Sequence, residues 1–320
     1  MKIGNIDLKH GLMLAPMAGV TDYSFRRICK KYGAEYMVSE MISAKGMHYN
    51  DNKTMILAKI TDEERPMGIQ IFGSEPNIMA EAAVRLQDSE YKPQVIDINM
   101  GCPMKKIVGN GEGSALMLNP ELARICIRAV VRAVKIPVTV KIRSGWNSDS
   151  INAVEIAEIA EFEGAAAICV HGRTRTQMYQ PPVDLEIIKC VKDSVSIPVI
   201  GNGGIENVDE ALKMLNFTGC DGIMIARGAM GNPWIFDEIT AALNGVAYTP
   251  PDITRRLKTA VEHAETLVCD KGNHIGVREA RKHMAWYIKG VTGATVARQK
   301  INTAETLDDI RQIVNDLVVN

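Results

Sequence analysis

The sequence lacks any run of the roughly 18 apolar residues that a membrane-spanning helix needs, and its first residues lack the charged-then-apolar pattern of a signal peptide. We therefore expect a cytoplasmic protein without a membrane partner. It also lacks an excess of either charge, with 37 Lys and Arg against 38 Asp and Glu. A net charge of −1 means that a nucleic-acid partner has to be held by a local basic surface.

Cysteine chemistry of the paired kind is also absent. The seven cysteines are an odd number, are widely scattered and form no Cys-x-x-Cys pair, so neither a disulfide framework nor a metal site is indicated. Cys126, Cys169, Cys190 and Cys220 lie in apolar contexts, where we expect them to be buried as small hydrophobic residues. Nothing in the sequence requires an oligomer.

The common nucleotide-binding motifs are missing as well. No G-x-x-x-x-G-K-[ST] motif occurs, which leaves nucleoside triphosphate hydrolysis without support. The dinucleotide motif G-x-G-x-x-G is also absent. The stretch from Gly109 to Gly113 resembles it, but its third glycine comes one position early, and we interpret it as a flexible lid.

What the sequence does contain is a repeated alternation of short apolar runs with amphipathic stretches rich in Ala, Glu, Lys and Leu. This alternation is typical of parallel strands joined by helices. Eight such runs predict an α/β fold of the (β/α)8 TIM-barrel class, for which about 250 residues are usual. The runs are Leu12–Gly19, Glu35–Met41, Pro66–Gly73, Val95–Pro103, Val138–Gly145, Ala166–Thr174, Pro198–Gly204 and Gly222–Gly228.

A change in composition at Tyr248–Pro251 predicts a second, helical domain. We expect a barrel domain over residues 1–245 and a helical domain over 246–320. Between Asp252 and Ile301 there are ten Lys and Arg but five Asp and Glu, so the helical domain is locally basic. Arg278, Lys282 and Lys289 are spaced to share one helix face, although a solvated face explains that spacing without a function.

Catalytic groups of a barrel lie where its strands end, and three of the predicted strands carry reactive side chains. Cys102 stands between Gly101 and Pro103 at the end of the fourth run, where we expect an exposed thiol able to act as an acid or a nucleophile. Lys141 and His171 lie on the adjacent fifth and sixth runs. A lysine inside an apolar strand needs a partner, either an anionic ligand or a structural ion pair.

Three other strand ends are rich in small residues. The segment Ala15–Gly19 would let a planar ring approach the backbone, although a tight turn explains it equally well. The turns Gly201–Gly204 and Ala226–Gly228 follow the last two strands, where barrels frequently bind phosphate through bare backbone N–H groups. Together they favour a phosphate-bearing ligand.

In these motifs the chain resembles the tRNA-dihydrouridine synthases, most closely their bacterial B-type branch. The resemblance spans nearly the whole barrel and extends into the helical region. It rests on Ala15–Asp22, Gln70–Gly73, Asn99–Pro103, Val140–Arg143, Val170–Arg175, Asn202–Ile205, Arg227–Gly228, Pro233–Phe236 and Arg278–Gly290.

The resemblance implies an enzyme that uses FMN, reduced by NADPH, to convert a D-loop uridine of tRNA to 5,6-dihydrouridine. Hydride would come from reduced flavin and the proton from Cys102, with Asn99 orienting the uracil. The implied FMN-binding residues are Pro16, Met17, Ala18, Gln70, Lys141 and His171, with the phosphate at Asn202, Gly203, Gly204, Ala226 and Arg227. Gly204 and Ala226 depart from the residues common there, an acidic one and glycine, so contacts at these two positions would come from the backbone.

A uridine in folded RNA has to be turned out of its stack to reach such a site. The resemblance and the basic helical domain implicate Arg173, Arg175, Arg278 and Lys282 in holding the tRNA. Two other readings remain open. A flavin barrel reductase of a small molecule, such as a dihydroorotate dehydrogenase, explains the flavin residues equally well, and a non-enzymatic RNA-binding protein would need no flavin.

Overall fold

The computed structural model describes residues 1–180 and 182–319, and the chain divides into two compact units. One comprises Met1–Tyr23 and Ala34–Ala226, and the other comprises Ser24–Gly33 and Arg227–Asn320. Helix α1 (Tyr23–Lys31) thus groups almost entirely with the C-terminal helices. The functional roles that we assigned to 1–245 and 246–320 remain a prediction.

The first unit is a closed barrel of eight parallel strands, which confirms the predicted fold class. Closure is explicit because β4 pairs with β3 on one side and with β6 on the other. Every strand lies within the apolar run that predicted it. The strands are β3 (Leu12–Leu14), β4 (Tyr36–Val38), β6 (Met67–Phe72), β7 (Val95–Met100), β8 (Val138–Arg143), β9 (Ala167–His171), β10 (Val199–Asn202) and β11 (Gly222–Ile225).

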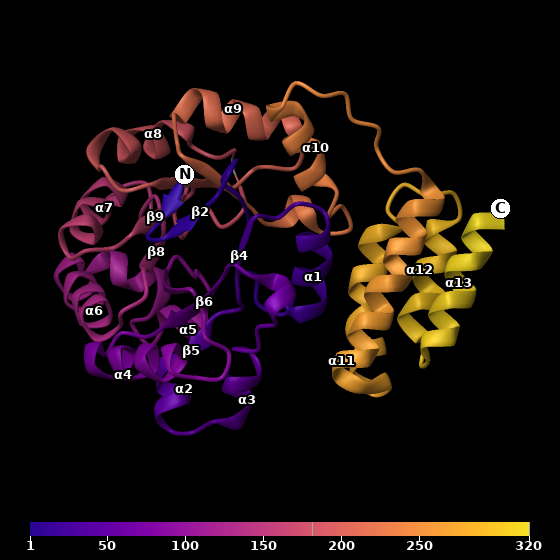
Figure 1. The fold of residues 1–320 in the computed structure, drawn as a ribbon, viewed down its shortest axis with the longest axis horizontal. Helices are drawn as coiled ribbons and strands as arrows, with labels where there is room; N and C mark the ends of the chain where they lie inside the picture. Colours follow the sequence, from indigo (N-terminus) through magenta and orange to yellow (C-terminus); the bar gives the residue numbers. More distant parts are fainter. Residues whose placement is uncertain (181, 320) are drawn as a thin grey trace. The chain divides into compact units, whose positions relative to one another are not determined.

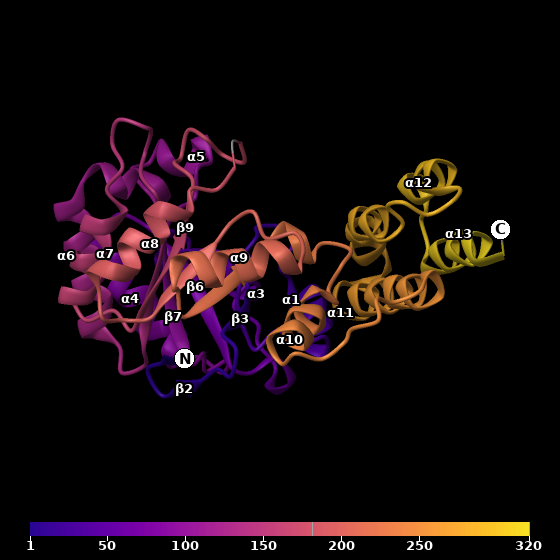
Figure 2. The same cartoon turned by 90° about the horizontal axis from the view of Figure 1, so that it is seen from above.

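Three short strands were not predicted. β5 (Ile42–Ser43) extends the sheet beside β6, and β1 (Lys2–Ile3) and β2 (Ile6–Asp7) form an antiparallel hairpin. Figure 2 shows this hairpin at the opposite end of the barrel from α5 (Lys105–Val108). Ile3 and Ile6 pack into the cluster of buried residues inside the barrel, so the hairpin closes the amino-terminal end.

Helices surround the barrel as an outer ring (Figure 1). Three of these helices begin at a capping residue. The side chains of Asn119, Asp184 and Asn207 accept hydrogen bonds from backbone N–H groups in the first turns of α6, α8 and α9. The ring helices are α4 (Pro76–Gln87), α6 (Pro120–Ala133), α7 (Ala153–Phe162), α8 (Leu185–Ser194) and α9 (Val208–Thr218). Shorter elements in the connections are α2 (Ala44–His48), α3 (Asn52–Ile56), η1 (Asp62–Glu64) and η2 (Gly113–Leu118).

The second unit is helical, as the sequence predicted. It contains η3 (Arg227–Ala229), α10 (Ile235–Leu243), α11 (Ile253–Tyr287), α12 (Ala294–Thr303) and α13 (Leu307–Val319). Gly272 adopts φ 76° and ψ 164°, which breaks α11 into two consecutive helices. The predicted face of Arg278, Lys282 and Lys289 is wrong in its last member, because α11 ends at Tyr287 and Lys289 lies in the turn that follows.

Two buried histidines lie in the core of the helical unit. The rings of His263 and His283 are 4.3 Å apart and both side chains are fully buried. Neither ring nitrogen of His283 has a hydrogen-bond partner among the described residues. Burial lowers the pKa of His283 well below its usual value, and the neighbouring His263, Lys282 and Lys271 lower it further.

This arrangement predicts sensitivity to acid. The folded state keeps His283 neutral while the unfolded chain binds a proton near pH 6.5, so stability is present above that pH and is lost as the pH falls. We expect His283→Leu to reduce the drop in melting temperature between pH 7.5 and pH 5.5 by about 3 °C or more. His274→Leu, at an exposed position, is the matched control and should leave the drop unchanged. Equal drops in all three proteins would contradict the prediction.

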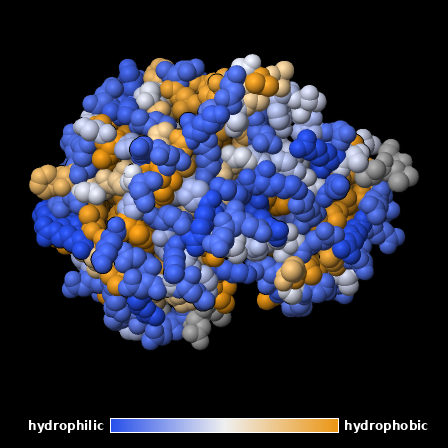
Figure 3. Space-filling model, viewed as in Figure 1, coloured by the Kyte–Doolittle hydropathy of each residue, from blue (hydrophilic) through white to orange (hydrophobic). Residues whose placement is uncertain are grey.

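No helix in the described part of the chain has both the length and the apolar character needed to cross a membrane. Most of the face drawn in Figure 3 is hydrophilic, with apolar side chains scattered between charged ones.

Candidate active site

The carboxyl ends of the eight parallel strands necessarily meet at one end of the barrel, and most of the predicted site residues lie there. They lie on, or one to four residues after, seven of the eight strands: Pro16, Met17, Ala18, Gln70, Asn99, Cys102, Lys141, His171, Asn202, Gly203, Gly204 and Ala226. Arg227, Arg278 and Lys282 belong to the helical unit instead.

Gln70 and Asn99 are linked by hydrogen bonds deep in this end. Gln70, on β6, is 1% exposed, and its Oε1 accepts a hydrogen bond of 2.7 Å from Nδ2 of Asn99. Its Nε2 donates to Oδ2 of Asp97 at 2.7 Å, and Oδ1 of Asp97 accepts from the Thr139 hydroxyl at 2.5 Å. Burial raises the pKa of Asp97 to about 6, although Gln70, Thr139 and the charge of Lys141 act in the opposite direction.

Lys141 is a half-buried cation without a carboxylate partner. Its Nζ donates to Oδ1 of Asn202 at 2.8 Å, while Nδ2 of Asn202 donates to the backbone oxygen of Met224 at 2.6 Å. Among the described residues no carboxylate lies within ion-pair distance of Lys141. The structural ion pair that we left open for this lysine is therefore not seen there, and the ammonium group is available for an anionic ligand.

Cys102 is held mainly by its backbone, and its thiol also interacts with the backbone of Met104. Its N–H donates to Oδ1 of Asn99 at 2.9 Å, and its carbonyl accepts from the N–H (3.1 Å) and the hydroxyl (2.9 Å) of Ser114. Arg143 fixes the preceding residue by donating to the Gly101 carbonyl at 2.8 Å. Burial raises the pKa of the Cys102 thiol above its usual value, so the group is neutral at pH 7 and can give up a proton.

Two expectations about cysteine exposure need correction. Cys102 is half-buried rather than exposed, because η2 and Ser114 cover its backbone. Cys190 is exposed, although we expected it to be buried, because it lies on the solvent side of α8, whose buried residues are Ile188 and Val191. Cys126, Cys169 and Cys220 are buried as expected.

The end of β9 brings a second group of basic side chains to the site. His171 ends the strand, and its Nε2 lies 3.4 Å from Nη1 of Arg173. Arg173 is only 5% exposed, whereas Arg175 is half-buried and stacks on Trp146 with its guanidinium carbon 4.6 Å from the ring centroid. The contribution of these two arginines to tRNA binding stays a prediction.

The glycines after β10 occupy positions where a side chain would collide with its neighbours or strain the backbone. Gly203 has φ 107°, and a Cβ atom there would lie 2.5 Å from Cδ2 of His171. Gly204 has φ 70°, so both backbone positions disfavour other residues. The groups at this end that remain available to a ligand are mainly hydrogen-bond donors. They are the backbone N–H groups of these glycines, the ammonium group of Lys141 and the remaining amide N–H groups of Gln70 and Asn99. Such a set fits a ligand with a phosphate and several carbonyl groups, as FMN has.

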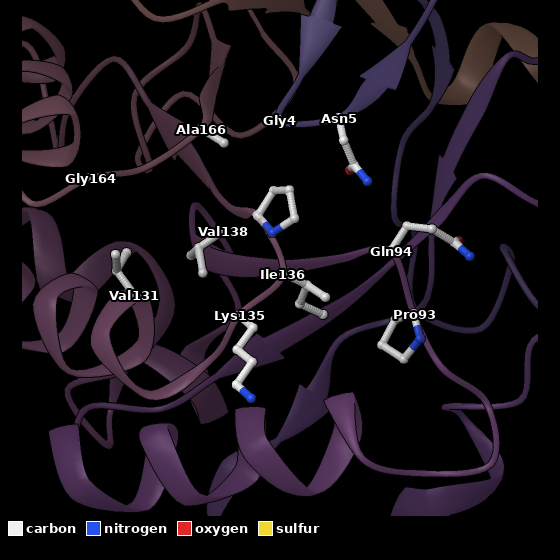
Figure 4. A pocket seen from close by; sticks show the side chains of 11 residues that line it. Gly4, Asn5, Pro93, Gln94, Val131, Lys135, Ile136, Val138, Gly164 and Ala166 are labelled. Carbon is white, nitrogen blue, oxygen red and sulfur yellow. The ribbon is translucent and has the colours of Figure 1, made fainter.

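A cavity of about 490 Å³ opens at the other end of the barrel (Figure 4). Its lining residues include Pro93, Gln94 and Lys135, which precede strands rather than follow them. Lys135 is its only charged side chain. The cavity therefore lacks the acid, base and phosphate-binding groups that meet at the carboxyl end.

Sequence reasoning missed Asp97, Thr139 and Arg143. The signal for Asp97 was present, since a carboxylate inside the apolar run Val95–Met100 has to be satisfied by neighbours. Arg143 was quoted only as part of a motif, yet its guanidinium also donates to the carbonyls of Thr174 and Met178 and so joins two loops of the site. No sequence spacing reveals such contacts.

Comparison with curated proteins gives consistent matches along the chain. The model of the family described as dihydrouridine synthase matches residues 13–319. A probable tRNA-dihydrouridine synthase of Rickettsia conorii is 43% identical over 304 residues, 94% of this chain and 91% of that protein. tRNA-dihydrouridine synthase B of Shewanella oneidensis is 44% identical, covering 90% and 89%, and that of Vibrio cholerae is 43% identical, covering 96% and 95%.

Among solved structures, a histamine dehydrogenase from Rhizobium sp. 4-9 matches with a TM-score of 0.60 and 14% identity, over 88% of this chain and 50% of that one. A 6-hydroxypseudooxynicotine amine oxidase from Pseudomonas geniculata N1 matches with a TM-score of 0.58 and 13% identity, over 83% and 52%. The chain spans about half the length of these two structures, and at such low identity they support the barrel fold alone. The family match and the B-type relatives confirm the resemblance seen in the motifs, and the chain belongs to the dihydrouridine synthase family.

Proposed function

We propose that this chain is a tRNA-dihydrouridine synthase that holds FMN at the carboxyl end of its barrel and reduces a D-loop uridine of tRNA, with NADPH as the reductant. The observation that carries the proposal is the position of Cys102, half-buried just after β7 and hydrogen-bonded through its backbone to a network of amide groups. General acid catalysis needs a protonated group within reach of the substrate, and a half-buried thiol whose pKa is raised by burial suits that role.

The donor set at the carboxyl end would hold the cofactor. Lys141 and His171 would face the ring system together with Gln70, while Pro16, Met17 and Ala18 would lie along it. Asn202, Gly203, Gly204 and Ala226 would receive the phosphate through backbone N–H groups. When bound and reduced, FMN supplies the hydride for one carbon of the uracil double bond.

The chain's own residues then account for the remainder of the reaction. Cys102 holds a proton for the other carbon, because burial keeps the thiol protonated at neutral pH. Asn99 donates to a uracil carbonyl through its remaining N–H and thereby orients the base. Arg143 and Ser114 hold the Cys102 segment in place by hydrogen bonds to its carbonyls.

The helical unit would bind the tRNA backbone, with Arg278 and Lys282 among the contacts, and the enzyme would act in the cytoplasm on a uridine turned out of its stack. Several cations of this unit have no carboxylate within ion-pair distance among the described residues. They are Arg255, Lys258, Arg278, Lys289 and Arg298. Unpaired cations are suited to phosphate contacts whose strength depends on salt.

Binding of tRNA should therefore weaken steeply as the salt concentration is raised. Arg278 should account for part of this salt dependence. We expect Arg278→Ala to weaken binding about three- to tenfold and to reduce the slope of log K against log salt by about 1. Arg281→Ala is the matched control, because Arg281 donates to the Ala304 carbonyl and serves the fold. A salt-independent affinity, or equal slopes for wild type and Arg278→Ala, would refute the electrostatic docking model.

The visible spectrum and the RNA requirement test the proposal as a whole. Purified protein should show flavin bands and should oxidise NADPH in step with dihydrouridine formation in tRNA. Reduction of free uracil or an enone at the same rate without RNA would instead favour a small-molecule reductase. A colourless protein that binds tRNA would favour the non-enzymatic reading.

A further inference from the structure

Asp97 is a buried carboxylate at the centre of the hydrogen-bonded network. It is 2% exposed on β7, and among the described residues no cation lies within ion-pair distance of it. Its only hydrogen-bond partners there are Nε2 of Gln70 and the hydroxyl of Thr139. Burying an acidic group without an ion pair costs free energy, so its presence calls for an explanation beyond packing.

A carboxylate that only accepts hydrogen bonds dictates which way its neighbours face. Gln70 has to turn Nε2 toward Asp97, which leaves Oε1 facing Asn99, and Asn99 then donates through Nδ2. Oδ1 of Asn99 accepts from the backbone N–H groups of Gly101 at 3.1 Å and Cys102 at 2.9 Å. We call the chain of hydrogen bonds from Asp97 through Gln70 and Asn99 the amide relay. Because backbone N–H groups only donate, the Asn99 end of this relay requires the same orientation of the two amides as the Asp97 end does.

The polarity limits what the two amides can offer a ligand. Oδ1 of Asn99 accepts two hydrogen bonds and Oε1 of Gln70 accepts one, so each amide keeps one N–H but Asn99 keeps no acceptor site. The second N–H of Asn99 meets only Sδ of Met41 at 3.8 Å. Asn99 can therefore only donate to a ligand, which suits a carbonyl oxygen and disfavours an amino group.

We propose that Asp97 is a positioning residue: by accepting from Gln70 it fixes the polarity of the Gln70–Asn99 amide relay and, through that relay, the backbone segment that carries Cys102. The inference rests on the proposed function, because the relay matters for catalysis only if Cys102 protonates a bound uracil.

Three substitutions separate polarity, charge and packing. Asp97→Leu keeps the branched shape of the side chain, although leucine is larger, and removes the acceptor. Asp97→Asn removes the charge, but its oxygen can still accept from Gln70 while its nitrogen donates to the Thr139 hydroxyl. Thr139→Val is the matched control, because it deletes the hydrogen bond at the other carboxylate oxygen and leaves the relay intact. Melting temperatures would confirm that each variant is folded.

Two readouts report the effect, namely the rate of dihydrouridine formation and the alkylation rate of Cys102 in a background where the exposed Cys190 and Cys269 are serine. Asp97→Leu should lower the rate of dihydrouridine formation about 30-fold and raise the alkylation rate of Cys102 at least about threefold, because the buried Gln70 amide loses its partner. Asp97→Asn and Thr139→Val should stay within about fivefold of wild type in the rate.

If Asp97→Leu does not fold, Gln70→Met tests the same relay from its other side and should raise Cys102 alkylation equally. A folded Asp97→Leu or Gln70→Met variant that matches Thr139→Val in alkylation would overturn the inference, as would an Asp97→Asn variant as impaired as Asp97→Leu. Wild-type protein that forms no dihydrouridine would overturn the proposed function instead.

Discussion

Replacing Cys102 with alanine is expected to lower the rate of dihydrouridine formation by about 10²- to 10⁴-fold, the usual contribution of a positioned general acid. The change removes the thiol and its proton. The hydrogen bonds that hold this segment use the backbone of Cys102, so they survive the substitution. Flavin content and tRNA affinity should therefore remain at wild-type values, which single-turnover rates, absorbance and a binding titration would show.

Cys190→Ala is the matched control, because Cys190 is the same residue type at an exposed position on α8 and should retain full activity. A Cys102→Ala protein that reduces uridine within a few-fold of the wild-type rate would remove the thiol from the mechanism. A variant that loses its flavin would show that Cys102 is needed for the fold of the site instead.

Replacing Lys141 with methionine should weaken FMN binding by about 10- to 100-fold, the range expected for losing a hydrogen bond from a charged group. Methionine keeps most of the side-chain volume but removes the half-buried ammonium group, whose one hydrogen-bond partner among the described residues is Asn202. Fluorescence titration of the flavin-free protein with FMN measures the effect directly.

The control for this prediction is Lys135→Met, which removes the only charge from the cavity at the amino-terminal end of the barrel. We expect its FMN affinity to be unchanged. If Lys135→Met weakened FMN binding and Lys141→Met did not, the flavin would lie in that cavity, and the assignment of the active site to the carboxyl end would be wrong.

The barrel was predictable because each strand is a short apolar run with its own flanking signals. Residues such as Val138–Val140 form a strand that is buried on both sides, and polar or Gly-rich stretches mark its ends. The predicted site followed from that assignment, since parallel strands bring their carboxyl ends together wherever they lie in the sequence.

What could not be predicted depends on contacts between distant residues or on very short elements. The β1–β2 hairpin consists of two-residue strands that leave no period to detect. Phe25 of α1 stacks on His263 with the ring centroids 5.6 Å apart, a contact over more than 200 residues of sequence that helps to group α1 with the C-terminal helices. The role of Asp97 likewise becomes visible only through its partners on β6 and β8.

The measurement that tests the account most directly is the dihydrouridine content of tRNA from cells that lack the gene and are complemented with wild type or Cys102→Ala. The account predicts that dihydrouridine at a D-loop position is lost with the gene, is restored by the wild-type chain and is not restored by Cys102→Ala. Unchanged dihydrouridine in the cells without the gene, or equal restoration by both chains, would contradict it.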